Sequence, residues 1–337
     1  MFYIAEIGLN HNGDLDLAKK MVAAARKAGA DAVKFQSIEA SSLVSPKTFD
    51  KPVNGFGFSE VNNLGDFWNK ISIGEGFHRE MKKYCDKIDI EFMSTPFDKK
   101  SADLLEELEV KRFKIASGDL TNYPLIEHIL LKNRPVLLST GGAAITEIKQ
   151  VVNFIGKTTK TVDLTLMHCV SLYPTPPDLA NLKAIDHLRN LFNCQIGFSD
   201  HTQGFHIPLA AIARGAKIIE KHFTIDQELP GPDQKISATP DIFSKIVKYG
   251  NQISSALQPE SKQVSEQEKK ELTEMRRSIV AARNLDAGKV ITKEDLDFKR
   301  PARGISPTEY KTVIGCKALT DIEKDEPIRW SMLNDKK

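Results

Sequence analysis

A (β/α)8 barrel followed by a small β-rich domain is the fold class that this sequence of 337 residues predicts. Short β-rich runs that end in polar residues alternate with amphipathic helical segments, and eight such pairs precede residue 258. Strands that alternate with helices form parallel sheets, and eight units in this length close into a barrel. A doubly wound sheet is the alternative, but no GxGxxG sequence follows the first strand.

The first strand and helix show the reasoning for each element. Residues 3–10 (YIAEIGLN) are a short apolar run, and apolar residues such as Met21 recur at helical spacing across 15–29. Asp14 can cap this helix and Gly29 can end it. The same criteria predict a second strand at 31–36.

An irregular insertion then interrupts the pattern. Residues 41–74 are rich in Asn, Gly, Ser and Phe, and a segment of this length in a compact domain is usually functional or flexible. Beyond it the alternation resumes. The predicted helices are 75–87, 99–108, 123–132, 144–155, 179–191, 207–215 and 240–256, and the predicted strands are 88–95, 112–117, 135–140, 161–169, 194–200 and 217–224.

Composition divides the chain into a barrel at 1–258, a linker at 259–274 and a second domain at 275–337. The linker, PESKQVSEQEKKELTE, is charged and poor in apolar residues, which is typical of an exposed helix or a linker. From residue 275 onward, short strand-like runs, turns and one brief helical segment predict a small β-rich domain.

Charge and cysteine usage exclude several classes of protein. Lys and Arg number 47 against 45 Asp and Glu, a net charge of +2, so a general nucleic-acid binder is not expected. No run of about 18 apolar residues exists, and residues 1–10 resemble neither a basic leader nor a cleavage site, so we expect neither a membrane span nor a signal peptide. The four cysteines are scattered without CxxC spacing, which favours reduced thiols in the cytoplasm.

Polar side chains end nearly every predicted strand, and in a barrel the carboxyl ends of the strands build the active site. Polarity at one strand end could reflect simple exposure, but its recurrence around the whole barrel predicts a functional site. The residues are Glu6, Asn10, His11, Lys34, Gln36, Ser94, Thr95, Lys114, Ser117, Asp119, Ser139, Thr140, His168, Ser171, Tyr173, Ser199, Asp200, His201, Lys221, His222 and Thr224.

Lys34 and Lys114 lie inside apolar runs, AVKFQ and FKIAS, where a buried lysine needs an anionic partner. Two separate structural ion pairs are one interpretation. The other is a site in which both cations and nearby hydroxyl groups surround a phosphate or a carboxylate. The hydroxyl groups are those of Thr95, Ser117, Ser139 and Ser199.

His201 and His222 end adjacent strands, in GFSDHT and EKHFT. Neighbouring strands are about 4.8 Å apart, so the two imidazoles could share one divalent metal that keeps open positions for water or substrate. Alternatively they serve as hydrogen-bond donors or general bases.

The ordered motifs AEIGLNHNGD, AGADAVKFQ, MSTPFD, FKIASGD, LLSTGG, HCVSLYPTP, GFSDHT, EKHFT and GPD resemble those of the sialic acid synthase family, over essentially the whole chain. The tail, with KRPARGIS, resembles the antifreeze-like (SAF) domain of these enzymes. Each motif alone is weak, whereas the ordered set is highly specific.

The resemblance implies a transferase that condenses phosphoenolpyruvate with an open-chain N-acetylmannosamine-type sugar. C3 of phosphoenolpyruvate attacks the sugar aldehyde, water adds at C2 and phosphate leaves by C–O cleavage, which gives a nine-carbon 2-keto acid. A divalent metal, usually Mn2+ with Mg2+ or Co2+ also acceptable, polarises the aldehyde oxygen in this scheme.

The resemblance also implies roles for individual residues. His201 and His222 match metal ligands, and Glu6 matches a carboxylate near the reacting centre. Arg300, in the tail, matches an arginine that completes the partner subunit's site, which implies a domain-swapped homodimer. Phosphoenolpyruvate would be held by Lys34, Thr95, Lys114, Ser117, Ser139 and Ser199, and the sugar by Gln36, Ser171, Tyr173 and Asp233.

Two departures leave the sugar open. Ser171 stands where some neuraminate synthases have Asn, and HCVSLYP also resembles legionaminic acid synthases, which use a 2,4-diacetamido-2,4,6-trideoxy hexose; the tail reads RPARGI where RPG is commoner. Two other function classes also remain at this stage: a different metal-dependent barrel enzyme, such as a hydrolase or sugar isomerase, and a non-catalytic protein that binds ice or glycans through its tail.

Overall fold

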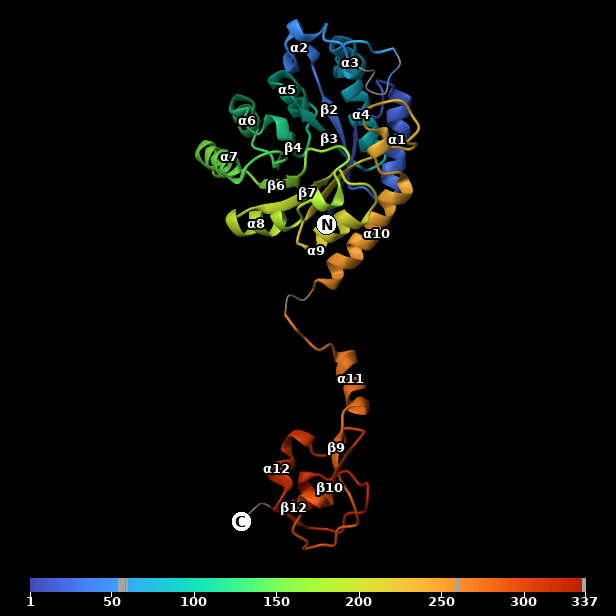
Figure 1. Cartoon of the computed structure of the whole chain (residues 1–337), viewed down its shortest axis with the longest axis vertical. Coiled ribbons are helices and arrows are strands. Elements are labelled where there is room, and N and C mark those ends of the chain that lie inside the picture. Colours follow the sequence, from blue (N-terminus) through green and yellow to red (C-terminus); the bar gives the residue numbers. More distant parts are fainter. Residues whose placement is uncertain (54–57, 59, 259–260, 335–337) are drawn as a thin grey trace. The chain divides into compact units, whose positions relative to one another are not determined.

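The protein, seen here in a computed structural model, divides into two compact units, residues 1–258 and 259–337, and the structure describes residues 1–53, 58, 60–258 and 261–334. In the first unit, strands and helices alternate along the chain as expected, with the helices outside the strands (Figure 1). The strands are β1 (Phe2–Gly8), β2 (Ala32–Ser37), β3 (Glu91–Pro96), β4 (Phe113–Ile115), β5 (Val136–Ser139), β6 (Leu164–Cys169), β7 (Gln195–Asp200) and β8 (Ile218–His222). The helices that alternate with them are α1 (Leu15–Lys27), α4 (Glu75–Lys87), α5 (Lys99–Glu107), α6 (Tyr123–Leu130), α7 (Ile145–Thr158), α8 (Lys183–Leu191), α9 (His206–Ala213) and α10 (Pro240–Ala256).

The eight strands form one parallel sheet with the hydrogen-bonded order β3-β2-β1-β8-β7-β6-β5-β4. β3 and β4, at the two ends of this order, are also in contact, so the sheet curls into a barrel. The predicted (β/α)8 fold is confirmed. Because all strands are parallel, their carboxyl ends lie at one end of the barrel.

Two layers of inward-pointing side chains fill the barrel. The lower layer is apolar and includes Ile4, Ala32, Met93 and Ile218. Alternate residues of a strand share a face, so the next inward residues toward the carboxyl ends are Glu6, Lys34, Thr95 and Glu220. The change from apolar to polar therefore occurs at the same height on several strands, and the apolar layer forms the floor of a polar site.

The insertion is more regular than expected. It contains two short helices, α2 (Ala40–Leu43) and α3 (Leu64–Ile71), and it packs its own small core around Phe58, Phe67 and Ile71. The side chain of Asn63 accepts a hydrogen bond from the Asp66 backbone at 2.8 Å and so caps α3. Residues 54–57 and 59 of the predicted insertion lie outside the described residues.

The second unit has a separate apolar core. Strands β9 (Ser278–Ala281) and β10 (Leu296–Lys299) pair antiparallel, as do β11 (Lys317–Ala318) and β12 (Leu333–Asn334), and α12 (Tyr310–Val313) packs beside them. The segment predicted as a linker contains helix α11 (Glu266–Met275), and its residues 259–260 lie outside the described residues. No helix in the described part of the chain combines the length and apolar character that crossing a bilayer requires.

Candidate active site

A cavity of about 260 Å³ opens at the carboxyl ends of the barrel strands. Of the fourteen residues to which the resemblance gives roles, twelve line it, Asp233 lies beside His222, and Arg300 belongs to the second unit. The lining residues are Glu6, Lys34, Gln36, Thr95, Phe97, Lys114, Ala116, Ser117, Gly118, Ser139, Cys169, Ser171, Tyr173, Ser199, His201, Glu220 and His222.

The strand register explains why the charged residues converge. Glu6 on β1 is the register partner of Lys34 on β2 and of His222 on β8. Residues at the same height on neighbouring parallel strands point to the same side, so all three side chains enter the barrel. Gln36 donates a hydrogen bond to Glu6 Oε1 at 3.0 Å, which holds this carboxylate in place.

Two lysines and two carboxylates form one connected network in the cavity. Lys34 Nζ lies 2.7 Å from Glu6 Oε2 and 3.7 Å from Glu220 Oε1, and Lys114 Nζ lies 3.0 Å from that same Glu220 oxygen. Burial opposes the charge of Lys34, but Glu220 and Glu6 outweigh burial and raise its pKa. Burial likewise opposes ionisation of Glu220, but Lys114 and Lys34 hold its pKa well below the usual range. The two lysines therefore do not form two separate ion pairs. Both of them approach the same carboxylate, that of Glu220.

Sequence reasoning missed Glu220, the centre of this network. The signal was present, since Glu220 is two residues before His222 and therefore points to the same side of β8. Ser199 Oγ donates a hydrogen bond to Glu220 at 3.1 Å, while Lys34 Nζ donates one to Thr95 Oγ1 at 2.9 Å. Cys169, also missed, lines the same cavity, and burial raises the pKa of its thiol.

Small residues and hydroxyl groups form another wall. The Gly141 backbone donates a hydrogen bond to Ser117 Oγ at 2.9 Å. A Cβ atom at Gly141 would lie 2.4 Å from Ser171 Oγ and 2.8 Å from Ser117 Oγ, so these hydroxyls need a glycine there. Ser139 Oγ is buried and makes no hydrogen bond within the described residues, which leaves it able to donate to a bound molecule.

The two histidines lie side by side. The ring centroids of His201 and His222 are 5.5 Å apart, and the Tyr173 ring is 4.2 Å from that of His201. His201 Nδ1 is 2.7 Å from the carbonyl oxygen of Val170, which can only accept, so Nδ1 carries the proton and Nε2 keeps a free lone pair. Burial, followed by the proximity of His222, lowers the pKa of His201 to about 3 and keeps the ring neutral.

This donor set fits a divalent metal ion. Neutral imidazoles are metal ligands, and His222 Nδ1 is buried without a hydrogen bond among the described residues, with Asp233 Oδ2 at 3.6 Å. Across that part of the chain, no group of three or more His, Cys, Asp or Glu side chains is placed to hold a metal. Two protein nitrogens would therefore leave the other coordination positions to water or substrate oxygen.

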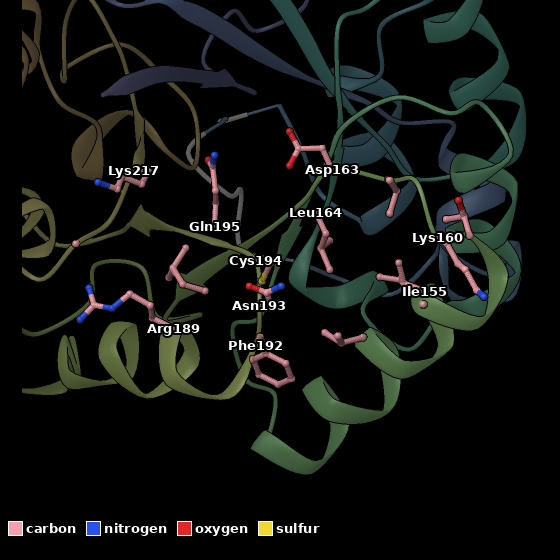
Figure 2. Close-up of a pocket in the computed structure, with 16 residues that line it drawn as sticks. Ile155, Lys160, Asp163, Leu164, Arg189, Phe192, Asn193, Cys194, Gln195 and Lys217 are labelled. Carbon is pink, nitrogen blue, oxygen red and sulfur yellow. The ribbon is translucent and has the colours of Figure 1, made fainter.

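A larger cavity of about 800 Å³ lies at the opposite end of β6 and β7, between α7 and α8 (Figure 2). Lys160 lies on one side of it, with Arg189 and Lys217 on the other, so the cations do not converge. The hydrogen bonds of Arg189 go to Asp186 and to the Arg214 carbonyl. We therefore assign the chemistry to the smaller cavity, where charges and imidazoles meet.

Comparison with known proteins gives matches over most of the chain. The NeuB family matches residues 21–262, and the SAF domain matches residues 276–334. N,N'-diacetyllegionaminic acid synthase of Campylobacter jejuni is 40% identical to this chain, over 97% of this chain and 98% of its own length. The Legionella pneumophila enzyme of the same name is 37% identical, over 98% of this chain and 93% of its own length. The structure of N-acetylneuraminic acid synthetase from Leptospira borgpetersenii, in complex with citrate, superposes with a TM-score of 0.72, 36% identity and coverage of 80% of this chain and 90% of that one.

Proposed function

This chain belongs to the NeuB family and is a transferase of the sialic acid synthase type, and on that premise we propose that it condenses phosphoenolpyruvate with an N-acyl hexose to give a nine-carbon 2-keto acid and phosphate. The observation that carries the proposal is one cavity that is lined both by two buried lysines and by two adjacent imidazoles. The lysines suit an anionic substrate, and the imidazoles suit a metal that meets a carbonyl oxygen.

Phosphoenolpyruvate would occupy the side with Lys34 and Lys114. Its phosphate and its carboxylate are both anions, and buried ammonium and hydroxyl groups can donate hydrogen bonds to them. In the structure Glu6 and Glu220 balance both lysines. Binding therefore requires the lysines to turn partly from carboxylate to substrate, with Ser139 supplying a donor that is unpaired in the described structure.

The sugar aldehyde would lie on the side with His201 and His222. A divalent ion held by these imidazoles would supply Lewis acidity at the aldehyde oxygen. Tyr173 covers the His201 ring, Gln36 lines the cavity and Asp233 lies beside His222, and both would offer polar groups to sugar hydroxyls. The carbon–carbon bond would form between C3 of phosphoenolpyruvate and the aldehyde carbon, between these two sides.

The reaction also needs a proton acceptor. Water adds at C2 and loses a proton, and the C–O bond to phosphate then breaks, so that one water is consumed for each phosphate released. Glu6 and Glu220, both ion-paired with Lys34, are the carboxylates within the cavity. Either could hold that proton once the lysine contacts shift to the substrate.

Two sugars are candidates. N-acetylmannosamine would give N-acetylneuraminate, the acid named for the Leptospira relative. A 2,4-diacetamido-2,4,6-trideoxy hexose would give a legionaminic acid, and two relatives of 40% and 37% identity carry that name. We further propose that Arg300 of one subunit contacts the N-acyl group in the site of another, within a homodimer.

The test is a panel of N-acyl hexoses, each incubated with phosphoenolpyruvate and Mn2+, with phosphate release and product mass measured. We expect phosphate release that depends on both substrates and a product mass equal to their sum plus water minus phosphoric acid. Conversion of a sugar without phosphoenolpyruvate would instead indicate an isomerase or hydrolase. Inhibition of ice growth without any turnover would indicate a binding protein.

A further inference from the structure

Another buried ion pair, outside the barrel lumen, is formed by the residues that directly precede the two histidines in the chain. Lys221 Nζ lies 2.5 Å from Asp200 Oδ2, and the two side chains are 1% and 0% exposed. Lys221 directly precedes His222 in the chain, and Asp200 directly precedes His201. Each residue of the ion pair is therefore the chain neighbour of one histidine. Because neighbouring residues of a strand point to opposite faces, the pair lies behind the imidazoles and takes no part in the cavity lining.

This pair also makes hydrogen bonds to the backbone of Thr202, the residue after His201. Lys221 Nζ also donates a hydrogen bond to the Thr202 carbonyl oxygen at 2.5 Å, and Asp200 Oδ1 accepts one from the Thr202 backbone at 2.9 Å. Asp200 and Lys221 are register partners at the ends of β7 and β8. Asp200 and Thr202, the residues on either side of His201, are thus both linked to Lys221, the strand residue before His222.

A buried ion pair is a poor way to gain stability, since desolvation of both charges offsets their attraction and well-packed apolar residues often do as well. The location of this ion pair indicates a role in the geometry of the two histidines instead. We propose that Lys221, through Asp200 and Thr202, is a positioning residue that fixes the separation of His201 and His222 for a shared divalent ion. This inference rests on the metal site of the proposed function and adds to it the group that sets the spacing of the ligands.

The test compares metal affinity with fold stability. Lys221→Met alone leaves Asp200 buried without a partner, so the informative protein is the double variant Lys221→Met/Asp200→Leu, in which both charges are replaced by apolar groups. Mn2+ binding to the full-length, substrate-free protein is followed by the electron paramagnetic resonance of free Mn2+, and unfolding by circular dichroism. We expect thermal stability to fall, because the two Thr202 backbone hydrogen bonds are lost, and Mn2+ affinity to weaken by roughly 10- to 100-fold, the range for loss of groups that orient metal ligands.

The matched control is Arg112→Met/Glu91→Leu. This pair joins the amino ends of β3 and β4, with Arg112 Nε 2.7 Å from Glu91 Oε1, away from the histidines. It should lower stability without any change in Mn2+ affinity. Lys221→Met/Asp200→Asn, which leaves no buried charge and keeps an acceptor for the Thr202 backbone, gives the same comparison if the first double variant does not fold.

Three outcomes overturn the inference. Wild-type Mn2+ affinity in the Lys221→Met/Asp200→Leu or Lys221→Met/Asp200→Asn protein would show that the pair is only structural. Equal weakening in the Arg112→Met/Glu91→Leu control would show a general effect of lost ion pairs. A wild-type protein that binds no Mn2+ would overturn both this inference and the metal site, whereas Mn2+ binding without turnover of any sugar would overturn the proposed reaction alone.

Discussion

At the residue scale, the candidate site consists of charges that the fold has removed from water. Lys34, Lys114, Glu6 and Glu220 are all nearly fully buried, and their charges are balanced by one another. Loss of one partner of a buried pair leaves an uncompensated charge, at a cost of about 3–5 kcal/mol. Substitutions in this group should therefore affect stability and activity together, and controls must separate the two effects.

Glu220→Gln should lower kcat by roughly 100- to 10,000-fold, the range for loss of an acid–base group, and the free energy of unfolding by about 3 kcal/mol. Steady-state kinetics and urea unfolding measure the two effects. The control is Glu91→Gln, which disturbs the ion pair with Arg112 at the other end of the strands and should reduce stability alone. Wild-type kcat in Glu220→Gln would exclude a role for this carboxylate in the reaction.

His222→Ala should abolish turnover while the circular dichroism spectrum stays that of the wild type, because the ring lines the cavity and makes no hydrogen bond within the described residues. EDTA should inactivate the wild type, and Mn2+ should restore its activity. The exposed His187 on α8 is the control position, and His187→Ala should retain full activity. Turnover by His222→Ala, or by the EDTA-treated protein, would refute the metal assignment.

Protonation of His11 should make stability depend on pH. Burial, with His78 next, lowers the pKa of His11 to about 4, whereas an unfolded histidine titrates near 6.5. Between these values only the unfolded chain binds the proton, so this histidine alone should lower the free energy of unfolding by up to about 1.4 kcal/mol per pH unit as the pH falls from 6.5 to 4. In His11→Gln the decrease over this window should be smaller than in the wild type, and urea unfolding at several pH values tests this.

At the element scale, strand and helix identity followed from periodicity, while exact ends depended on local contacts. The helix expected at 179–191 begins only at Lys183, since Pro177–Leu179 forms a separate 3-10 turn. The insertion was expected to be irregular, yet α3 forms there because its apolar face packs on Phe58 and Leu9. Short amphipathic segments of this kind depend on a partner surface that periodicity alone does not reveal.

The loop after β5 offers an element-scale test. Gly141→Ala would place a Cβ against Ser117 and Ser171, whose hydroxyls can rotate away, so the fold should survive while the cavity changes. We expect kcat/KM to fall by roughly 10- to 100-fold, as for small misplacements of groups that position a substrate. Gly156→Ala, on α7 with open space around the position, should retain normal activity. Unchanged kinetics in Gly141→Ala would show that these hydroxyls do not hold the substrate.

At the scale of the whole molecule, the two units have separate hydrophobic cores. The large cluster between strands and helices lies entirely within residues 1–258, and the cluster around Ile279, Val313 and Ile328 lies entirely within the second unit. A domain with its own core can fold alone. Each unit is therefore a candidate for independent folding.

A protein truncated after residue 258 should unfold cooperatively and still bind Mn2+, because both histidines and the other described residues that line the cavity belong to the first unit. It should form no product, since the proposed contact of Arg300 with the sugar is lost. Full-length Arg300→Ala is the matched comparison, and it should show the same loss of sugar use without removal of the domain. Full activity of the truncated protein would refute the role of the second unit in catalysis.

The sequence by itself determined the barrel, the end at which its polar residues gather, and most of the cavity lining. These features follow from local periodicity: apolar alternation defines the strands, and parallel strands necessarily place their carboxyl ends together. Lys34, Lys114, His201 and His222 could be singled out because ionisable residues stand out in or directly after apolar runs.

Only the tertiary structure decided how these residues pair. Lys114 on β4 and Glu220 on β8 belong to strands that are not neighbours in the sheet, and their contact across the lumen exists because the sheet curls on itself. The Lys221–Asp200 tie depends likewise on the register of β7 against β8. Contacts between residues so distant in sequence are fixed by strand order, register and closure, none of which a local pattern contains.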